Sequence, residues 1–249
     1  MTRLAPLASA ALALLAACAA PSGAARSVVR VASDLDNRPF AFVDDAGRPG
    51  GRDVEMMQLV AERAGLELEW RRMPFEALLD AAAAGEVDVV CATIGVTPER
   101  AARVDFTRPY FETTQAVLVR AGAGEPRWLS DLAGRRVAAS ADTTSGRAAR
   151  ARLAASELVF DSKSGLSPSE RLLTREVDAV VLDRPSADER ARASDGALVV
   201  LAEQLAVERY ALVVAPERDD LRERLDAALA ALQGELARLD ARHGLAPPR

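Results

Sequence analysis

The chain has 249 residues, a length that allows one or two domains with sizeable cores. Its 37 acidic and 32 basic side chains leave a formal net charge of -5, which argues against a nucleic-acid-binding protein, because such proteins carry a basic patch. One histidine, His243, and two cysteines, Cys18 and Cys91, argue against a Ser-His-Asp triad, a metal site and a disulfide framework, and we expect neither metal nor cofactor.

The N-terminal segment reads MTRLAPLASAALALLAAC. Arg3 supplies a short positive region, and residues 4–17 form an apolar stretch of signal-peptide length that is too short for a stable membrane span. The stretch ends in LAAC, which resembles the lipobox of bacterial lipoproteins, in which the cysteine becomes the lipidated first residue. We therefore predict a signal peptide over residues 1–17, a lipid anchor on Cys18 and a small-residue tether over residues 18–26. The alternative is an ordinary signal peptide cut at an alanine-rich site.

Strands and helices alternate in the next part of the chain. Residues 27–34, SVVRVASD, predict a strand, and residues 87–95, VDVVCATIG, predict a strand buried on both faces, with Cys91 as a small buried hydrophobe. Periodicity predicts helices over residues 52–65 and 74–86, with a strand over residues 66–70 between them. This β-α-β-α-β order predicts a doubly wound parallel sheet.

The same order of elements then recurs. Short branched runs predict three strands and helical runs predict two helices, in the order 135–140, 143–156 (helix), 157–161, 167–176 (helix) and 177–183. An internal echo supports two related halves, because EVDVV begins at Glu86 and EVDAVV begins at Glu176, each leading into an apolar strand. We therefore predict two doubly wound α/β lobes.

Two further segments, TTQAVLVR at residues 113–120 and ERYALVVA at residues 208–215, predict strands that cross between the lobes. One lobe would contain residues 27–112 and 210–249, ending in a helix over residues 219–244, and the other would contain residues 113–209. We expect the lobes to move about a two-strand hinge near residues 113–115 and 208–210.

Polar residues follow several predicted strand ends, where ligands bind in open α/β sheets. Two predicted helix starts, at Thr97 to Arg100 and at Thr143-Thr144, offer backbone N–H donors to an anion, and Arg100 adds a planar fork suited to a carboxylate. Asp183, at the end of a strand, suits an ammonium group. This combination predicts a site for a zwitterion. A bound carboxylate would also explain a cation in the first turn of a helix, where the dipole disfavours it.

The segment ATIGVTPERAARVDFTRPYF resembles the signature of family 3 solute-binding proteins of ABC transporters, S-x-x-T-x-T-x-E-R followed by F-[ST]-x-P-Y. The resemblance extends from Val28 to about Gly244 and implies a type II periplasmic-binding-protein fold. It also implies roles for single residues. Arg100 would clamp an α-carboxylate with help from Thr144, Asp183 and Thr93 would hold the α-ammonium, Phe75 would stack on the ligand side chain, and Asp34, Asn37, Gly95 and Thr143 would complete the site.

This sequence departs from the family pattern mainly in the side-chain pocket. The residue found here and the family residue that it replaces are Asn37 instead of an aromatic residue, Gly95 instead of a hydroxyl residue, Ala92 instead of Ser, Arg52 instead of Phe and Asp142 instead of Gly. Plainer interpretations also stay open: a solvated Arg100, Asp183 as a turn cap, Phe75 in the core, and Thr143 and Thr144 as caps only. We expect Trp70, Tyr110 and Phe111 to serve packing, and Arg38 and Arg52 to lie on the surface.

The resemblance implies an extracytoplasmic, monomeric protein that captures an amino acid or similar small polar solute and presents it to the permease of an ABC importer, without chemistry on the ligand. Two alternatives remain. One is a cyclohexadienyl dehydratase-like enzyme on the same fold, for which Glu208 or Asp142 would be the candidate general acid. The other is a ligand-sensing module for a separate membrane partner. No nucleic-acid partner is expected, and the membrane would be reached through the lipid anchor only.

Overall fold

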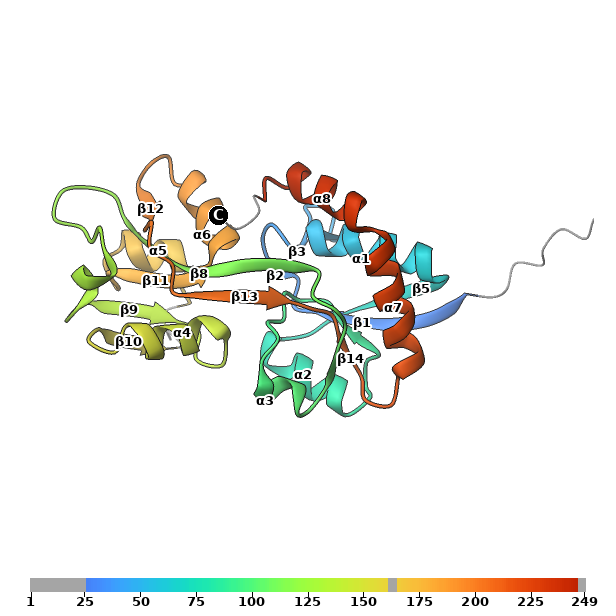
Figure 1. Ribbon diagram of the computed structural model, residues 1–249. Helices are drawn as coiled ribbons and strands as arrows, with labels where there is room; N and C mark the ends of the chain where they lie inside the picture. The colour runs from blue at the N-terminus through green and yellow to red at the C-terminus, as the bar shows by residue number, and fades with distance from the viewer. Residues whose placement is uncertain (1–25, 161–164, 246–249) are drawn as a thin grey trace, which may run out of the picture.

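The computed structural model describes residues 26–160 and 165–245 and has two α/β lobes, each built on its own sheet (Figure 1). Two long strands, β8 (Phe111–Arg120) and β13 (Ala206–Tyr210), run between the lobes. They pair antiparallel, from Ala206 opposite Gln115 to Tyr210 opposite Phe111. The fold class predicted from the sequence is confirmed.

The first sheet has the strand order β5-β1-β6-β14-β7. Strands β5 and β6 run parallel to β1, and β14 runs antiparallel to its neighbours; the bounds are β1 (Ser27–Ser33), β5 (Leu66–Arg72), β6 (Val89–Val90), β7 (Asp105–Phe106) and β14 (Val213–Val214). Alternate residues of β6 face opposite cores. Val89 packs with α1 (Arg52–Ala64), α7 (Asp219–Ala231) and α8 (Gln233–Arg242), and Val90 packs with α2 (Phe75–Ala83). A two-residue period therefore places helices on both faces of this sheet.

A small antiparallel sheet lies beside the first lobe and was not predicted. It contains β2 (Asp36–Asn37), β3 (Ala41–Val43) and β4 (Pro49–Gly50). Gly51 follows it with φ 108°, and a Cβ there would lie 2.4 Å from the carbonyl oxygen of Phe40. Glycine is therefore required where this sheet turns into α1.

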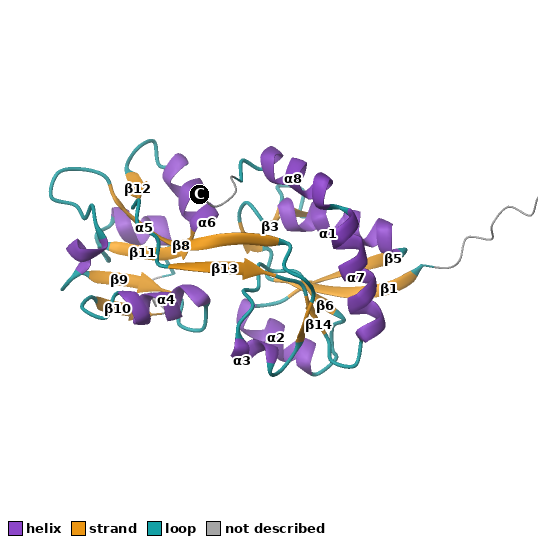
Figure 2. Ribbon diagram, in the orientation of Figure 1, coloured by secondary structure: helices purple, strands orange, loops and turns teal. Residues whose placement is uncertain are grey.

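The second sheet has the order β10-β9-β11-β8-β12. Strands β9 (Arg136–Ala139), β10 (Glu157–Phe160) and β11 (Ala179–Asp183) run parallel, and β12 (Leu198–Val200) pairs antiparallel with β8. Helix α4 (Thr144–Arg152) packs on one face, while α5 (Pro168–Leu173) and α6 (Arg184–Arg192) pack on the other (Figure 2). One 3-10 turn, Leu129–Leu132, precedes β9.

Several predicted elements differ from the structure. The strand predicted over residues 208–215 is interrupted at Ala211 and Leu212, which divides it into β13 and β14. The closing helix is two helices that meet at Leu232, and the strand predicted over residues 87–95 is reduced to β6. Helix α6, which begins directly after Asp183, was missed because Arg184-Pro185 resembles a turn.

Arg52 was predicted to lie on the surface, and this is wrong, because its side chain is fully buried. Its Nε donates to Asp240 Oδ1 at 2.8 Å and its Nη1 to Asp53 Oδ1 at 3.2 Å. Arg38 is exposed, as predicted, and lies over the ring of Phe42. Tyr110 and Phe111 are buried in the first core, and Trp70 packs against it, so the packing role predicted for all three is confirmed.

Cys91 is fully buried, as predicted, and burial raises the pKa of its thiol well above the ordinary value. Cys18, the predicted lipid anchor, lies outside the described residues. In the part of the chain that the structure describes, every helix is too short or too polar to cross a membrane.

Candidate ligand-binding site

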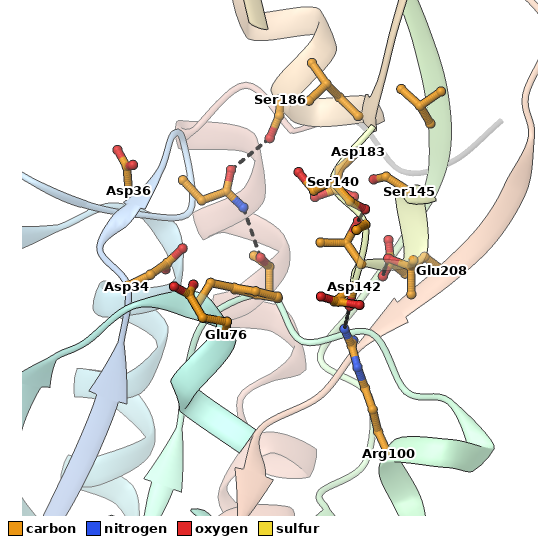
Figure 3. A pocket seen from close by; sticks show the side chains of 18 of the residues that line it. Asp34, Asp36, Glu76, Arg100, Ser140, Asp142, Ser145, Asp183, Ser186 and Glu208 are labelled. Carbon is orange, nitrogen blue, oxygen red and sulfur yellow. Dashed lines mark hydrogen bonds between the residues drawn. The ribbon is translucent and has the colours of Figure 1, made fainter. Parts of the chain in front are cut away.

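A cavity of about 560 Å³ lies between the two lobes. The lobe built on the first sheet lines it with Asp34, Asp36, Asn37, Phe75, Glu76, Thr93 and Arg100, and the second lobe lines it with the loop at residues 140–145, the end of β11, Ser186, Arg190 and Glu208. Figure 3 shows Asp34, Asp36 and Glu76 on one side, facing Asp183, Ser145 and Glu208 on the other. The cavity thus lies beyond the carboxyl ends of strands, where ligands bind in open α/β sheets.

Asp34 follows β1 directly and reaches the cavity wall. Burial raises the pKa of this carboxyl to about 6. Its Oδ1 atom is buried and accepts no hydrogen bond from any described residue. A buried carboxylate oxygen without a donor is costly, so this position is suited to a ligand that donates a hydrogen bond or carries positive charge.

Thr93 and Asn37 form a polar link across the cavity. Thr93 has φ 50°, a left-handed conformation that is rare for a β-branched residue and is typical of functional sites. Its Oγ1 accepts a hydrogen bond from Asn37 Nδ2 at 2.9 Å. Asn37 Oδ1 accepts one from Ser186 Oγ, also at 2.9 Å, and Ser186 belongs to the other lobe. The side chain of Asn37 therefore connects the two lobes (Figure 3).

Arg100 lies on α3 (Pro98–Ala101), a single turn whose N-cap Thr97 accepts a hydrogen bond from the Arg100 backbone N–H. A helix this short has little dipole, so the unfavourable position inferred from the sequence is mild. The side chain is 8% exposed, and Nη1 and Nη2 donate to the carbonyl oxygens of Gly95 at 2.9 Å and Asp142 at 3.3 Å. Among the described residues, no carboxylate oxygen lies within 4.0 Å of its guanidinium. Burial, and then the charge of Arg147, lowers its pKa.

Helix α4 begins at the cavity. Thr143 is its N-cap, and its Oγ1 accepts a hydrogen bond from the Gly146 backbone N–H at 3.2 Å. A Cβ at Gly146 would lie 2.3 Å from the carbonyl oxygen of Ser140, so glycine lets the loop fold back over the helix start. Thr144 is the first helical residue, and its hydroxyl donates to Glu208 Oε1 at 2.5 Å. Both threonines line the cavity, and Thr143 is also a cap.

Asp183 and Glu208 lie on either side of one amide. Gln115 Nε2 donates to Asp183 Oδ1 at 2.6 Å and also to Glu208 Oε2. Glu208 is 6% exposed, and burial followed by the charge of Asp183 raises its pKa to about 8. This carboxyl is therefore mostly protonated at neutral pH.

Gly95 was predicted to contact the ligand, but it is not one of the residues that line the cavity. It lies behind the cavity wall, against Arg100 and Glu208. A Cβ at this position would lie 2.1 Å from Glu208 Oε1 and 3.0 Å from Thr144 Cγ2. Glycine in place of the family's hydroxyl residue is thus explained by the space that Glu208 occupies.

Phe75 is half-buried, packs against the core beside α2 and also lines the cavity.

Sequence reasoning missed Ser186, Glu76 and Arg190 as cavity residues. It considered Gln115, whose amide donates to Asp183, only as part of the hinge, and Glu208 only as part of the hinge and as the acid of an enzyme. A signal for Gln115 existed, because it is an amide at the start of the apolar run AVLV in a crossing strand.

Six carboxyl groups and two guanidinium groups line the cavity. Such an excess of carboxyl groups favours a ligand with more positive than negative charge.

Comparison with known proteins identifies the family of the chain. The model of the bacterial extracellular solute-binding proteins, family 3, matches residues 29–246. A probable histidine-binding protein of Neisseria gonorrhoeae is 37% identical over 104 residues, which cover 42% of this chain and 39% of that protein. The chain spans about half the length of the first curated relatives that it matches, from 39% to 56%.

Solved structures are similar over most of the chain. An ancestral arginine-binding protein bound to arginine has a TM-score of 0.78 and 28% identity, covering 88% of this chain and 99% of that one. The ancestral amino acid-binding protein AncCDT-1, a precursor of cyclohexadienyl dehydratase, has a TM-score of 0.76 and 25% identity, covering 87% of this chain and 94% of that one. The chain belongs to the bacterial extracellular solute-binding proteins, family 3.

Proposed function

We propose that this protein captures an α-amino acid with a positively charged side chain, L-arginine first, and presents it to the permease of an ABC importer. The observation that carries the proposal is Arg100, a buried guanidinium without a carboxylate partner among the described residues, on the wall of a cavity otherwise rich in carboxyl groups. A zwitterion with a second positive charge complements both features.

The ligand's α-carboxylate would meet Arg100. Among the described residues its guanidinium donates only to carbonyl oxygens, so none of them supplies the paired counterion that would offset its desolvation. A carboxylate accepts charge-assisted hydrogen bonds from such a fork, and the start of α4 lies on the facing wall. The α-ammonium would then point to Asp183, on the side of the cavity formed by the second lobe.

The ligand's side chain would extend toward Asp34, with Phe75 beside it and Glu76 nearby. The unpartnered Asp34 Oδ1 offers an acceptor for a guanidinium or imidazolium donor. The similar proteins known to bind arginine and named as binding histidine support this class of side chain.

Contacts between described residues join the two lobes across the cavity. Ser186 donates to Asn37 and to the Arg38 carbonyl oxygen, Arg100 donates to the Asp142 carbonyl oxygen, and Arg147 Nη1 lies 3.2 Å from Glu99 Oε2. A ligand in a cavity held by such contacts needs the lobes to separate, and the crossing strands β8 and β13 are the hinge we propose. We also propose a monomer that is anchored outside the cytoplasm through Cys18.

Calorimetry with four free amino acids tests the proposal. We expect L-arginine to bind most tightly, L-histidine and L-glutamine more weakly, and L-glutamate not measurably, because a second carboxylate would face Asp34. Small-angle scattering with saturating L-arginine should show compaction if the open form is populated in solution. Binding of L-glutamate more tightly than of L-arginine would overturn the assignment of the ligand class.

One observation favours a second function. Burial and the charge of Asp183 raise the pKa of Glu208 and favour its acid form, and Glu208 lines the same cavity as Arg100. A dehydratase would need such a pair to bind an acid and to protonate a leaving hydroxyl. Incubation with prephenate or arogenate, followed by the absorbance of an aromatic product, separates the two functions. We expect no product above the rate of the Glu208→Gln variant.

A further inference from the structure

Asp183 and Glu208 form a compact carboxyl pair where β11 and β13 approach the cavity. One amide, Gln115, donates a hydrogen bond to each carboxyl, and Thr144 donates a further one to Glu208 Oε1 at 2.5 Å. Gln115 is itself held, because its Oε1 accepts a hydrogen bond from Ser145 at 2.5 Å. The pair is therefore fixed by two crossing strands and the start of α4.

The carboxyl pair has no ion-pair partner among the described residues, because no arginine there lies within ion-pair distance of Asp183 or Glu208. The titratable and charged groups that act on Glu208 are Asp183 on β11, Arg100 on α3 and the phenol of Tyr210 on β13, while β8 and α4 present the neutral Gln115 and Thr144. A buried carboxyl group such as Glu208, this close to a second carboxyl group, favours a proton or a cation between the two.

We propose that Glu208 and Asp183 together form the seat of the ligand's ammonium group, and that the ammonium replaces a proton held on Glu208. This inference rests on the proposed function. Capture then breaks one O–H bond on Glu208, the proton leaves to the solvent, and the resulting carboxylate accepts a hydrogen bond from the ligand. No other covalent bond changes.

The consequence is a coupling between capture and pH. The free protein keeps Glu208 mostly protonated below pH 8, and a bound cation favours the ionised form. Ligand affinity therefore rises with pH by up to about tenfold per pH unit until pH 8, and it levels off above that value.

The test is calorimetry of L-arginine binding to the full chain at pH 7.2 in two buffers of different ionisation enthalpy. The difference in heat gives the number of protons released, which we expect to be close to one for the wild-type protein. The Glu208→Gln variant, which imitates the protonated side chain, should release almost none, and its affinity should vary little between pH 6.5 and 8.

The Asp34→Asn variant is the matched control, because the pKa of Asp34 is about 6 and that carboxyl is already ionised at pH 7.2. It should bind L-arginine more weakly and still release close to one proton. Heat that is independent of the buffer in the wild-type protein, with binding intact, would overturn this inference and leave the proposed function standing. Equal proton release by wild type and Glu208→Gln would overturn the assignment to Glu208. Absence of L-arginine binding in every buffer would overturn both proposals.

Discussion

Two of the buried arginines, Arg52 and Arg100, have different partners. Arg52 is fully buried between α1 and α8, with Asp240 and Asp53 at 2.8 and 3.2 Å. Arg100 is 8% exposed at the cavity, and within the described part of the chain its guanidinium donates only to carbonyl oxygens. Burial lowers the pKa of Arg52, but the charges of Asp53 and Asp240 outweigh it and leave that pKa raised. The pKa of Arg100 is lowered, because no described carboxylate compensates its burial to the same extent.

The contrast separates stability from binding. A structural cation has its counterion in the fold, so removing it leaves buried carboxylates behind. A cation in a binding site receives its counterion from the ligand. Removing it should therefore leave the fold intact and lower the affinity for the ligand. Asp34 follows the same pattern with the opposite charge, because its Oδ1 is buried and no cation of the described residues pairs with it.

Arg52→Met gives the largest effect we expect from this comparison. The apolar chain fills part of the space, but Asp53 loses a partner inside a fully buried site. The free energy of unfolding should fall by roughly 3–5 kcal/mol. Urea denaturation measures it, and the matched control is Arg48→Ala, whose exposed ion pair with Asp44 should contribute less than about 1 kcal/mol. Equal losses in the two variants would remove the distinction.

Asp34→Asn should stabilise the ligand-free protein in a pH-dependent way. The folded state raises the pKa of this carboxyl to about 6, above its unfolded value, so ionising it costs folding energy as pH rises from about 4 to 6. The variant should therefore gain on the order of 1–3 kcal/mol at pH 7 and little at pH 4. Thermal unfolding at both pH values checks this, and a gain of the same size at pH 4 would show that the charge is not the cause.

Ser186→Ala should have the smallest effect. The variant removes the donor to Asn37 Oδ1 and leaves that oxygen with one contact fewer between the lobes. One such hydrogen bond contributes roughly 0.5–1.5 kcal/mol, so the affinity for L-arginine should fall about two- to twelvefold. Ser194→Ala is a control on the same side of the molecule, because the hydrogen bonds of its hydroxyl with described residues lie within the second lobe. Unchanged affinity in Ser186→Ala would mean that this bridge does not hold the lobes closed.

The sequence predicted the fold well where local patterns decide it. Gly65 at the end of α1, Thr97 and Thr143 as caps, and the repeated EVD runs before β6 and β11 all lie where expected. In the two halves, Asp88 and Asp178 accept hydrogen bonds from the backbone N–H groups of Arg30 and Arg136, which explains the echo. Such contacts repeat because both lobes close a parallel strand pair in the same way.

The site was harder to predict, because it depends on contacts between residues far apart in the chain. Arg52 and Asp240 are 188 positions apart, so nothing local showed that this arginine is buried. Gln115 and Glu208 come from the two crossing strands, and their meeting depends on the register of β8 with β13. The position of Arg100 was predictable from its motif, whereas its lack of a carboxylate partner was visible only in three dimensions.

The measurement that tests the role of Arg100 most directly is a two-by-two comparison by calorimetry. Wild type and Arg100→Ala are each titrated with L-arginine and with agmatine, which is arginine without its carboxylate. If Arg100 binds the carboxylate, the variant should lose roughly 2–5 kcal/mol with L-arginine, on the order of 30-fold to several thousandfold in affinity. With agmatine it should lose nothing, and circular dichroism should show an intact fold. Losses that are equal for both ligands, or within about threefold of wild type for L-arginine, would contradict the account.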